Sequence, residues 1–278
     1  MIAGNFSGMT PKLAVLNLYE DVVRLKEFAL EHGFSGIDWS FELETIPVTP
    51  LGESKWVKAQ SLLQPLEVRY HCPFSRVDLG HIDPVQSQAA GKLLRRVVNL
   101  VSRAGGRYLS IHLGLGMDST EGLSWERSID SLRDLVHYGA EHRVRVCLEN
   151  LAWGWTSRPN LFEKLIRRSG AWVTLDMGHA FVCESVASGY YSFKDFVTPH
   201  PDRIMNAHVY HKEIQGQGHI PPSSLDQIEE RLMWLGRTSC TWWVLEIKDV
   251  PALLRTKEIV DQFFVARQFM VPRRMNSI

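Results

Sequence analysis

Short apolar runs alternate along the chain with segments in which apolar residues repeat at the spacing of an α-helix. The runs predict β-strands, and the repeating segments predict amphipathic helices. Between each predicted strand and the next lies a segment long enough for a helix. The predicted strands are residues 1–6, 36–40, 68–71, 108–112, 145–149, 172–176, 204–209 and 242–246.

Capping residues mark the helix boundaries. The clearest helix begins at Asp83-Pro84, where an N-cap residue precedes a proline at the first helical position, and it ends at Gly105-Gly106. Gly33 ends an earlier helix that begins near Val22. Further helices are expected at residues 54–63, 129–140, 161–168, 225–235 and 259–264; residues 181–201 and 212–224 are expected to be irregular, and residues 271–278 a frayed tail.

The alternation of strands and helices indicates the fold class. Strand–helix–strand units favour parallel pairing, and eight such units in about 250 residues fit a closed (β/α)₈ TIM barrel. An open, doubly wound α/β sheet is the alternative, but no Gly-x-Gly-x-x-Gly motif follows the first predicted strand. No linker or shift in composition divides the chain, so we expect residues 1–278 to form a single domain. Its active site is expected at the C-terminal ends of the strands.

Composition narrows the classes of function. Hydrophobic residues make up 45% of the chain and charged residues 22%, which is typical of a globular protein with ample core material. The 31 basic and 31 acidic residues cancel, so nothing supports a nucleic-acid-coating surface, although a local basic groove remains open. Four cysteines without paired spacing favour reduced thiols. Without a secretory pattern or a run of roughly 20 apolar residues, we expect a cytoplasmic protein that does not enter membranes.

Metal-capable side chains recur where the predicted strands end. Glu149 closes an apolar strand, where an unpaired buried charge would cost several kcal/mol. His112, Asp176, His208 and Glu246 end four other strands in the same way. Because the C-terminal strand ends of a barrel converge on one mouth, these side chains should face one another there.

Three carboxylates and one imidazole form a ligand set for a hard or borderline divalent ion. We predict that Glu149, Asp176, His208 and Glu246 hold one such ion per chain, with Mn²⁺ or Zn²⁺ favoured and Mg²⁺ or Co²⁺ as alternatives. Each residue alone has an ordinary explanation; Asp176, for example, could simply cap the next helix. Recurrence at several strand ends favours the metal. The side chains expected around this set are His71, His112, His179 and His219.

Two tryptophans follow Glu149 directly. Trp153 and Trp155 lie in the loop after the predicted strand 145–149. They are candidate substrate-binding residues of a sugar-sized pocket, and packing within the loop is an equally good explanation.

Taken together, these motifs resemble the xylose-isomerase-like TIM barrels, a superfamily of sugar isomerases and epimerases that also includes endonuclease IV. The resemblance spans nearly the whole chain. It is specific for the superfamily and does not select one activity. The motifs that carry it are His71-Cys-Pro-Phe, His112-Leu-Gly, Glu149-Asn-Leu, Asp176-Met-Gly-His179, Ala-His208-Val-Tyr-His and Glu246-Ile-Lys.

The resemblance implies one divalent ion held by the four predicted ligands, with Glu149 and Glu246 also moving protons. The expected activity is isomerisation or epimerisation of a sugar, sugar phosphate or polyol ketone through a metal-stabilised enediolate. The expected partner is a small carbohydrate, in a chain that could form a homo-oligomer. A dehydratase of a keto-inositol would use much the same site.

Endonuclease IV offers the other alternative, hydrolysis at abasic DNA sites by three zinc ions. By resemblance, His71 and His112 match its first zinc site, which shares Glu149 with the central one. His179 and His219 match the third, but the aspartate expected two residues before the second histidine is Gln217 here. A neutral amide is a weak zinc ligand, so this third site is in doubt. Together with the balanced charge, this counts against a nucleic-acid partner.

Overall fold

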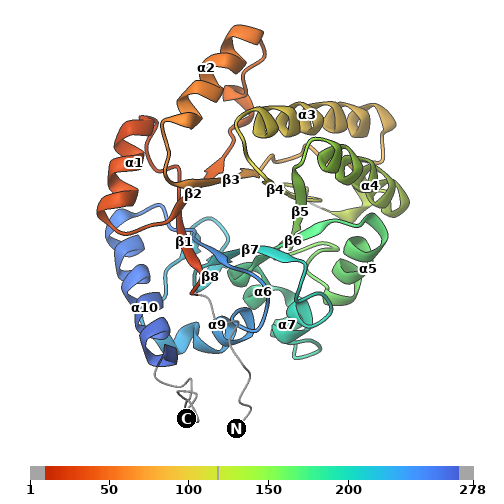
Figure 1. The fold of residues 1–278 in the computed structure, drawn as a ribbon. Coiled ribbons are helices and arrows are strands. Elements are labelled where there is room, and N and C mark those ends of the chain that lie inside the picture. Colours follow the sequence, from red (N-terminus) through yellow and green to blue (C-terminus); the bar gives the residue numbers. More distant parts are fainter. Residues whose placement is uncertain (1–9, 118, 269–278) are drawn as a thin grey trace, which may run out of the picture.

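The computed structural model describes residues 10–117 and 119–268, and within them eight parallel strands close into a barrel. Around the ring the strands run in the order β1-β10-β7-β6-β5-β4-β3-β2, with the helices packed outside (Figure 1). This is the predicted (β/α)₈ TIM barrel. No helix in these ranges is both long enough and apolar enough to cross a bilayer.

The barrel strands agree closely with the apolar pattern, and four of them have the predicted bounds. They are β1 (Lys12–Leu16), β2 (Gly36–Ser40), β3 (Glu67–Cys72), β4 (Tyr108–Ile111), β5 (Arg145–Glu149), β6 (Trp172–Asp176), β7 (Ile204–Val209) and β10 (Trp242–Leu245). The strand predicted at residues 1–6 lies outside the described residues. The first strand of the barrel is β1, which the apolar pattern did not assign.

The outer helices follow the capping signals. The Asp83 carboxylate accepts a hydrogen bond from the backbone N–H of Val85 at 2.9 Å, which fixes the predicted start of α3. The main helices are α1 (Val22–Glu31), α2 (Pro50–Ser61), α3 (Pro84–Arg103), α4 (Trp125–Glu141), α5 (Pro159–Ser169), α9 (Glu229–Leu235) and α10 (Val250–Gln268). Short turns of 3-10 helix lie at Leu43–Thr45, Thr120–Gly122 and Leu225–Gln227.

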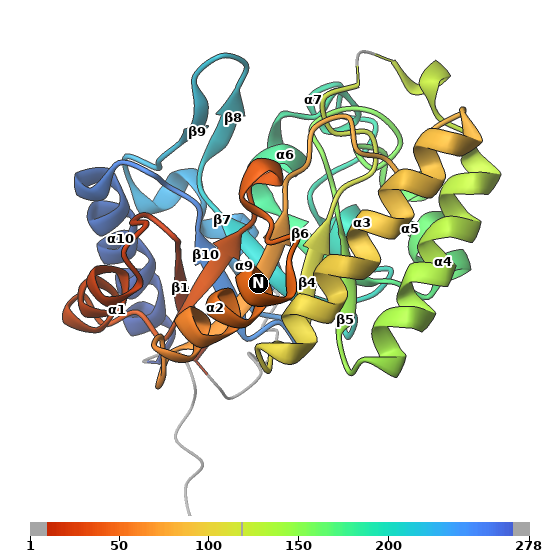
Figure 2. The ribbon, with the colours of Figure 1, turned by 90° about the horizontal axis from the view of Figure 1, so that it is seen from above.

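Two predictions about irregular segments were wrong, and one predicted helix is divided in two. Residues 212–224 contain an antiparallel hairpin, β8 (Lys212–Ile214) and β9 (Gly218–Ile220), whose strands are too short to show a period-two pattern. Residues 181–201 hold the short helices α7 (Glu184–Ala187) and α8 (Lys194–Val197), after α6 (Met177–Val182). The helix predicted at residues 225–235 is interrupted at Ile228. Figure 2 shows the hairpin and α7 at the same end of the barrel.

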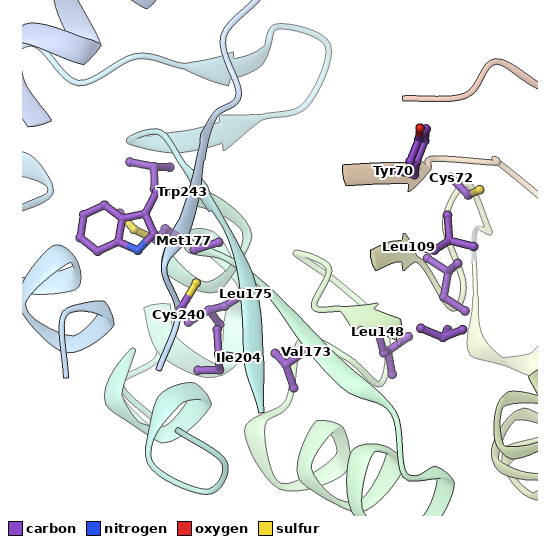
Figure 3. Packing of buried hydrophobic residues seen from close by; sticks show 14 of the residues in the cluster. Tyr70, Cys72, Leu109, Leu148, Val173, Leu175, Met177, Ile204, Cys240 and Trp243 are labelled. Atoms are coloured by element: carbon purple, nitrogen blue, oxygen red, sulfur yellow. The ribbon is translucent and has the colours of Figure 1, made fainter. Parts of the chain in front are cut away.

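The apolar core lies between the strands and the surrounding helices. Figure 3 shows part of this layer, in which Tyr70, Leu148 and Trp243 are fully buried. Alternate strand residues point the other way, into the barrel. This period of two places the side chains at the strand ends above a polar interior.

That interior forms a hydrogen-bonded floor beneath the mouth. Asn206 donates to Ser110 Oγ at 3.2 Å and to Thr174 Oγ1 at 3.0 Å. Arg69 donates to Asn206 Oδ1 at 2.7 Å and stacks on the Trp242 ring. Buried polar groups satisfied in this way hold the strands in register. The residues two positions further along β3, β4, β6 and β7 are therefore fixed at the mouth: His71, His112, Asp176 and His208.

Candidate metal centre

Three of the predicted ligands, all carboxylates, converge on the imidazole of the fourth, His208, at the mouth of the barrel. His208 Nδ1 lies 3.3 Å from Glu149 Oε1, 3.6 Å from Asp176 Oδ2 and 3.0 Å from Glu246 Oε2. All four residues are buried. The strand-end pattern thus brings together side chains that lie far apart in the sequence.

The hydrogen bonding of this cluster is incomplete in a way that fits a cation. Among the described residues, neither Oε2 of Glu149, Oε2 of Glu246 nor either ring nitrogen of His208 makes a hydrogen bond of good geometry. Three buried carboxylates facing one imidazole leave an excess of negative charge, which is costly in a protein interior unless it is compensated. Oxygen and imidazole ligands of this kind suit a divalent ion such as Mn²⁺ or Zn²⁺.

Protonation of His208 compensates part of this charge in the metal-free protein. Burial acts against its charged form, but the carboxylates of Glu149 and Glu246 outweigh burial and hold the pKa of His208 well above its usual value. Burial likewise opposes ionisation of Glu149, yet the positive charge of His208 keeps the pKa of Glu149 well below normal. The imidazolium therefore supplies part of the positive charge that a bound metal ion would supply.

Asp176 is held in place by hydrogen bonds with three neighbouring residues. Its side chain accepts a hydrogen bond from the His179 backbone N–H at 2.6 Å, so it does cap α6, and Oδ1 also accepts one from the Tyr210 hydroxyl at 2.8 Å. Gly178 makes room for that ring, since a Cβ there would lie 2.0 Å from Tyr210 Cε2. The side-chain amide of Asn150 donates a hydrogen bond to the Asp176 carbonyl and accepts one from the Asp176 backbone N–H. Capping and a place in the cluster are thus compatible for Asp176.

A second ligand group shares Glu149. His71 Nε2 and His112 Nε2 lie 2.6 Å apart, and Glu149 Oε2 lies 3.4 Å from the first and 3.6 Å from the second. Burial lowers the pKa of His112 to about 3, so this imidazole is neutral and offers a lone pair. These three atoms lie close enough together to hold a metal ion of their own.

Asp38 is a cluster residue that the sequence analysis missed. It lies on β2, fully buried, with its Oδ2 3.9 Å from His71 Nδ1. Burial raises the pKa of Asp38 to about 6. An acid inside an apolar strand, the signal used for Glu149, would have identified it, but Asp38 stands two residues before its strand ends.

The third ligand group contains a carboxylate, Glu213, that the sequence analysis did not identify. His179 Nε2 lies 2.8 Å from Glu213 Oε2, and the hairpin register places Glu213 opposite His219. The carboxylate missing at Gln217 is thus supplied from the facing strand. Burial opposes charge on His179, but Asp176 and Glu213 outweigh it and raise the pKa of His179 to about 10. His219 donates from Nδ1 to the Glu246 carbonyl at 3.0 Å.

The two tryptophans lie in the loop that follows β5 and its terminal Glu149. Both line a cavity of about 720 Å³ formed by loops at the mouth of the barrel. Trp155 also packs edge-on against Trp125, with ring centroids 5.1 Å apart. Trp155 therefore both lines the cavity and packs within its loop.

The barrel and its clustered carboxylates and imidazoles define a TIM-barrel protein with a candidate metal centre at the strand ends. The chain belongs to the xylose isomerase-like TIM barrel family, whose family model matches residues 27–237.

Known relatives and folds agree with this assignment. An uncharacterized protein, MJ0008 of Methanocaldococcus jannaschii, is 28% identical over 186 residues, covering 66% of this chain and 80% of the relative. A D-tagatose 3-epimerase-like protein superposes with a TM-score of 0.70 at 16% identity, covering 94% of this chain and 99% of the other. The 3-keto-D-glucoside 4-epimerase from E. coli superposes with a TM-score of 0.69 at 13% identity, covering 92% of this chain and 100% of the other. Endonuclease IV from Thermus thermophilus superposes with a TM-score of 0.63 at 15% identity, covering 93% of this chain and 99% of the other. At these identities the structural matches establish the fold.

Proposed function

We propose that this chain is a divalent-metal-dependent isomerase or epimerase of a sugar, sugar phosphate or related polyol ketone. The observation that carries the proposal is the convergence of Glu149, Asp176, Glu246 and His208 with unsatisfied buried atoms. The names of two matched structures, a D-tagatose 3-epimerase-like protein and a 3-keto-D-glucoside 4-epimerase, support a sugar as the substrate.

The four ligands would hold the ion, which when bound supplies a Lewis acid for negative charge on a substrate oxygen. Glu149 and Glu246 would move the proton. They lie on strands separated by β6 and β7 in the ring, so they approach the mouth from different sides. One takes a proton from the carbon next to the carbonyl, and the other returns it from the opposite face for epimerisation. Trp153 and Trp155 would contact the substrate.

The proposal is tested by incubating metal-loaded protein with a panel of ketoses and a keto-inositol in D₂O. Turnover with deuterium at the reacting carbon, absent after metal removal, is the expected result. Turnover without deuterium would exclude proton exchange with solvent, and elimination of water from the keto-inositol would assign a dehydratase instead.

The second candidate function is incision of DNA at abasic sites. It is favoured by the two further ligand groups, because Glu213 completes the third one. The net charge of +0 counts against it. We expect no nicking of a duplex with a synthetic abasic site. Incision that is abolished in His71→Ala and weakens steeply with salt would replace the isomerase proposal.

A further inference from the structure

A cavity of about 720 Å³ is formed by loops at the end of the barrel where the strands carry the metal-ligand cluster. Its walls come from the loops after β4, β5 and β6, the strands whose ends carry His112, Glu149 and Asp176. Its volume is within the usual range for a small-molecule site, about 300–1,000 Å³. The cluster residues do not line it, so it is a compartment separate from the candidate metal centre.

Two of the aromatic rings that line this cavity have few aromatic neighbours. Trp153 is half-buried and has no ring contact with any other described aromatic residue. Tyr190 is 80% exposed, and its ring meets that of Tyr191 edge-to-face, at a centroid distance of 4.9 Å. Aromatic rings left open in a cavity offer flat apolar faces to a ligand.

Two opposite charges line the same cavity without pairing. The side chains of Arg158 and Glu184 make no hydrogen bond or ion pair with the residues that the structure describes, and the Asn160 amide is also uncommitted. Hydroxyls of Ser119, Thr120 and Ser188 complete the polar lining. A phosphate or a nucleic-acid backbone would be repelled by Glu184. A neutral polyhydroxylated ring can accept from Arg158, donate to Glu184 and stack on an indole.

Trp153 connects the cavity to the cluster. A Cβ placed on Gly114 would lie 3.6 Å from Trp153 Cη2, so the indole abuts the loop that leaves His112 two residues earlier. Trp153 itself follows Glu149 by four residues. Trp153 therefore connects the loops that form the cavity to the strand ends that carry His112 and Glu149.

We propose that this cavity binds a second sugar ring, and that the substrate is a glycoside or disaccharide whose reacting ring sits at the metal cluster. The assignment rests on the proposed function for the reacting ring. The stacking surface is supplied by Trp153 and Tyr190, and the hydroxyl contacts by Arg158, Glu184 and Asn160.

The test is calorimetric binding of glucose, maltose, cellobiose, lactose and melibiose to the full chain. At least one disaccharide should bind about tenfold more tightly than glucose, and Arg158→Ala should remove about that factor, as expected for a charge-assisted hydrogen bond. Tyr190→Ala, at a solvent-exposed position, should weaken binding without changing the melting temperature. Arg167→Ala is the matched control, because this exposed arginine lies near the other end of α5.

The outcomes separate this inference from the proposed function. If no disaccharide binds more tightly than glucose, or if binding is unchanged in both cavity variants, the second-ring assignment is wrong. Deuterium exchange on free ketoses with no gain from a second ring would overturn it and leave the proposed function intact. Arg158-dependent disaccharide binding without exchange on any ketose would uphold the cavity as a sugar site and refute the proposed function.

Discussion

A divalent ion that enters the cluster should displace a proton from His208. In the metal-free protein the pKa of His208 is raised well above its usual value, because Glu149 and Glu246 outweigh burial. Both glutamates have lowered pKa values and are already ionised near neutral pH, so they release none. Asp38, with a pKa of about 6, contributes about one-tenth of a proton at pH 7. We therefore expect about one proton per ion.

The assay is calorimetric titration of chelator-treated protein with Mn²⁺ or Zn²⁺ in buffers of different ionisation enthalpy. The slope of the observed heat against buffer enthalpy gives the protons released. Affinity should also rise about tenfold per pH unit between pH 6 and 8. A second ion at His179, Glu213 and His219 would release a further proton, because the pKa of His179 is raised to about 10. Heats independent of the buffer would refute the idea that His208 is protonated in the metal-free protein and loses its proton when the ion binds.

Three further perturbations address other parts of the cluster and its support. On an accepted substrate, Glu149→Gln and Glu246→Gln should each lower turnover by about 10² to 10⁴-fold, with the double variant scarcely slower; near-normal activity in either would remove that glutamate from the mechanism. Asp38→Asn should stabilise the metal-free protein by up to about 3 kcal/mol above pH 6. The folding of the wild type raises the pKa of Asp38 from 3.8 to about 6, so the wild type loses stability as the pH rises through 6. The gain should vanish near pH 4, and an equal gain at both pH values in thermal melts would contradict this prediction. Gly178→Ala puts a Cβ 2.0 Å from a tyrosine ring and should cost about 1–3 kcal/mol in urea unfolding, whereas Gly91→Ala, which meets nothing closer than 3.9 Å inside α3, should not destabilise.

Much of the barrel could be predicted because each strand is a short apolar run between polar boundaries. The bounds of β5 and β6 were predicted correctly because a charged residue, Glu149 or Asp176, ends each strand. The bounds of β7 were also predicted correctly. Strand β1 was missed because its five residues follow a similar apolar segment at residues 1–6. Local pattern cannot decide which of two neighbouring apolar segments pairs with the last strand.

The convergence of side chains at the strand ends could be predicted from the sequence. Contacts that depend on packing between distant segments could not. Glu149, Asp176, His208 and Glu246 converge as expected because all parallel barrel strands end at one mouth. Glu213 could not be recognised, since its position opposite His219 depends on the register of a hairpin whose strands are three residues long. The cavity beside Trp153 is formed by three loops whose relative positions no sequence spacing determines.

Metal content by inductively coupled plasma mass spectrometry tests the central claim most directly. Protein purified with metal supplementation and then extensively dialysed should retain a divalent ion in the cluster. Asp176→Asn should lose this ion while its circular dichroism stays unchanged, because the exchange keeps the size of the side chain and removes its charge. Wild-type protein that holds no ion after supplementation would contradict the account.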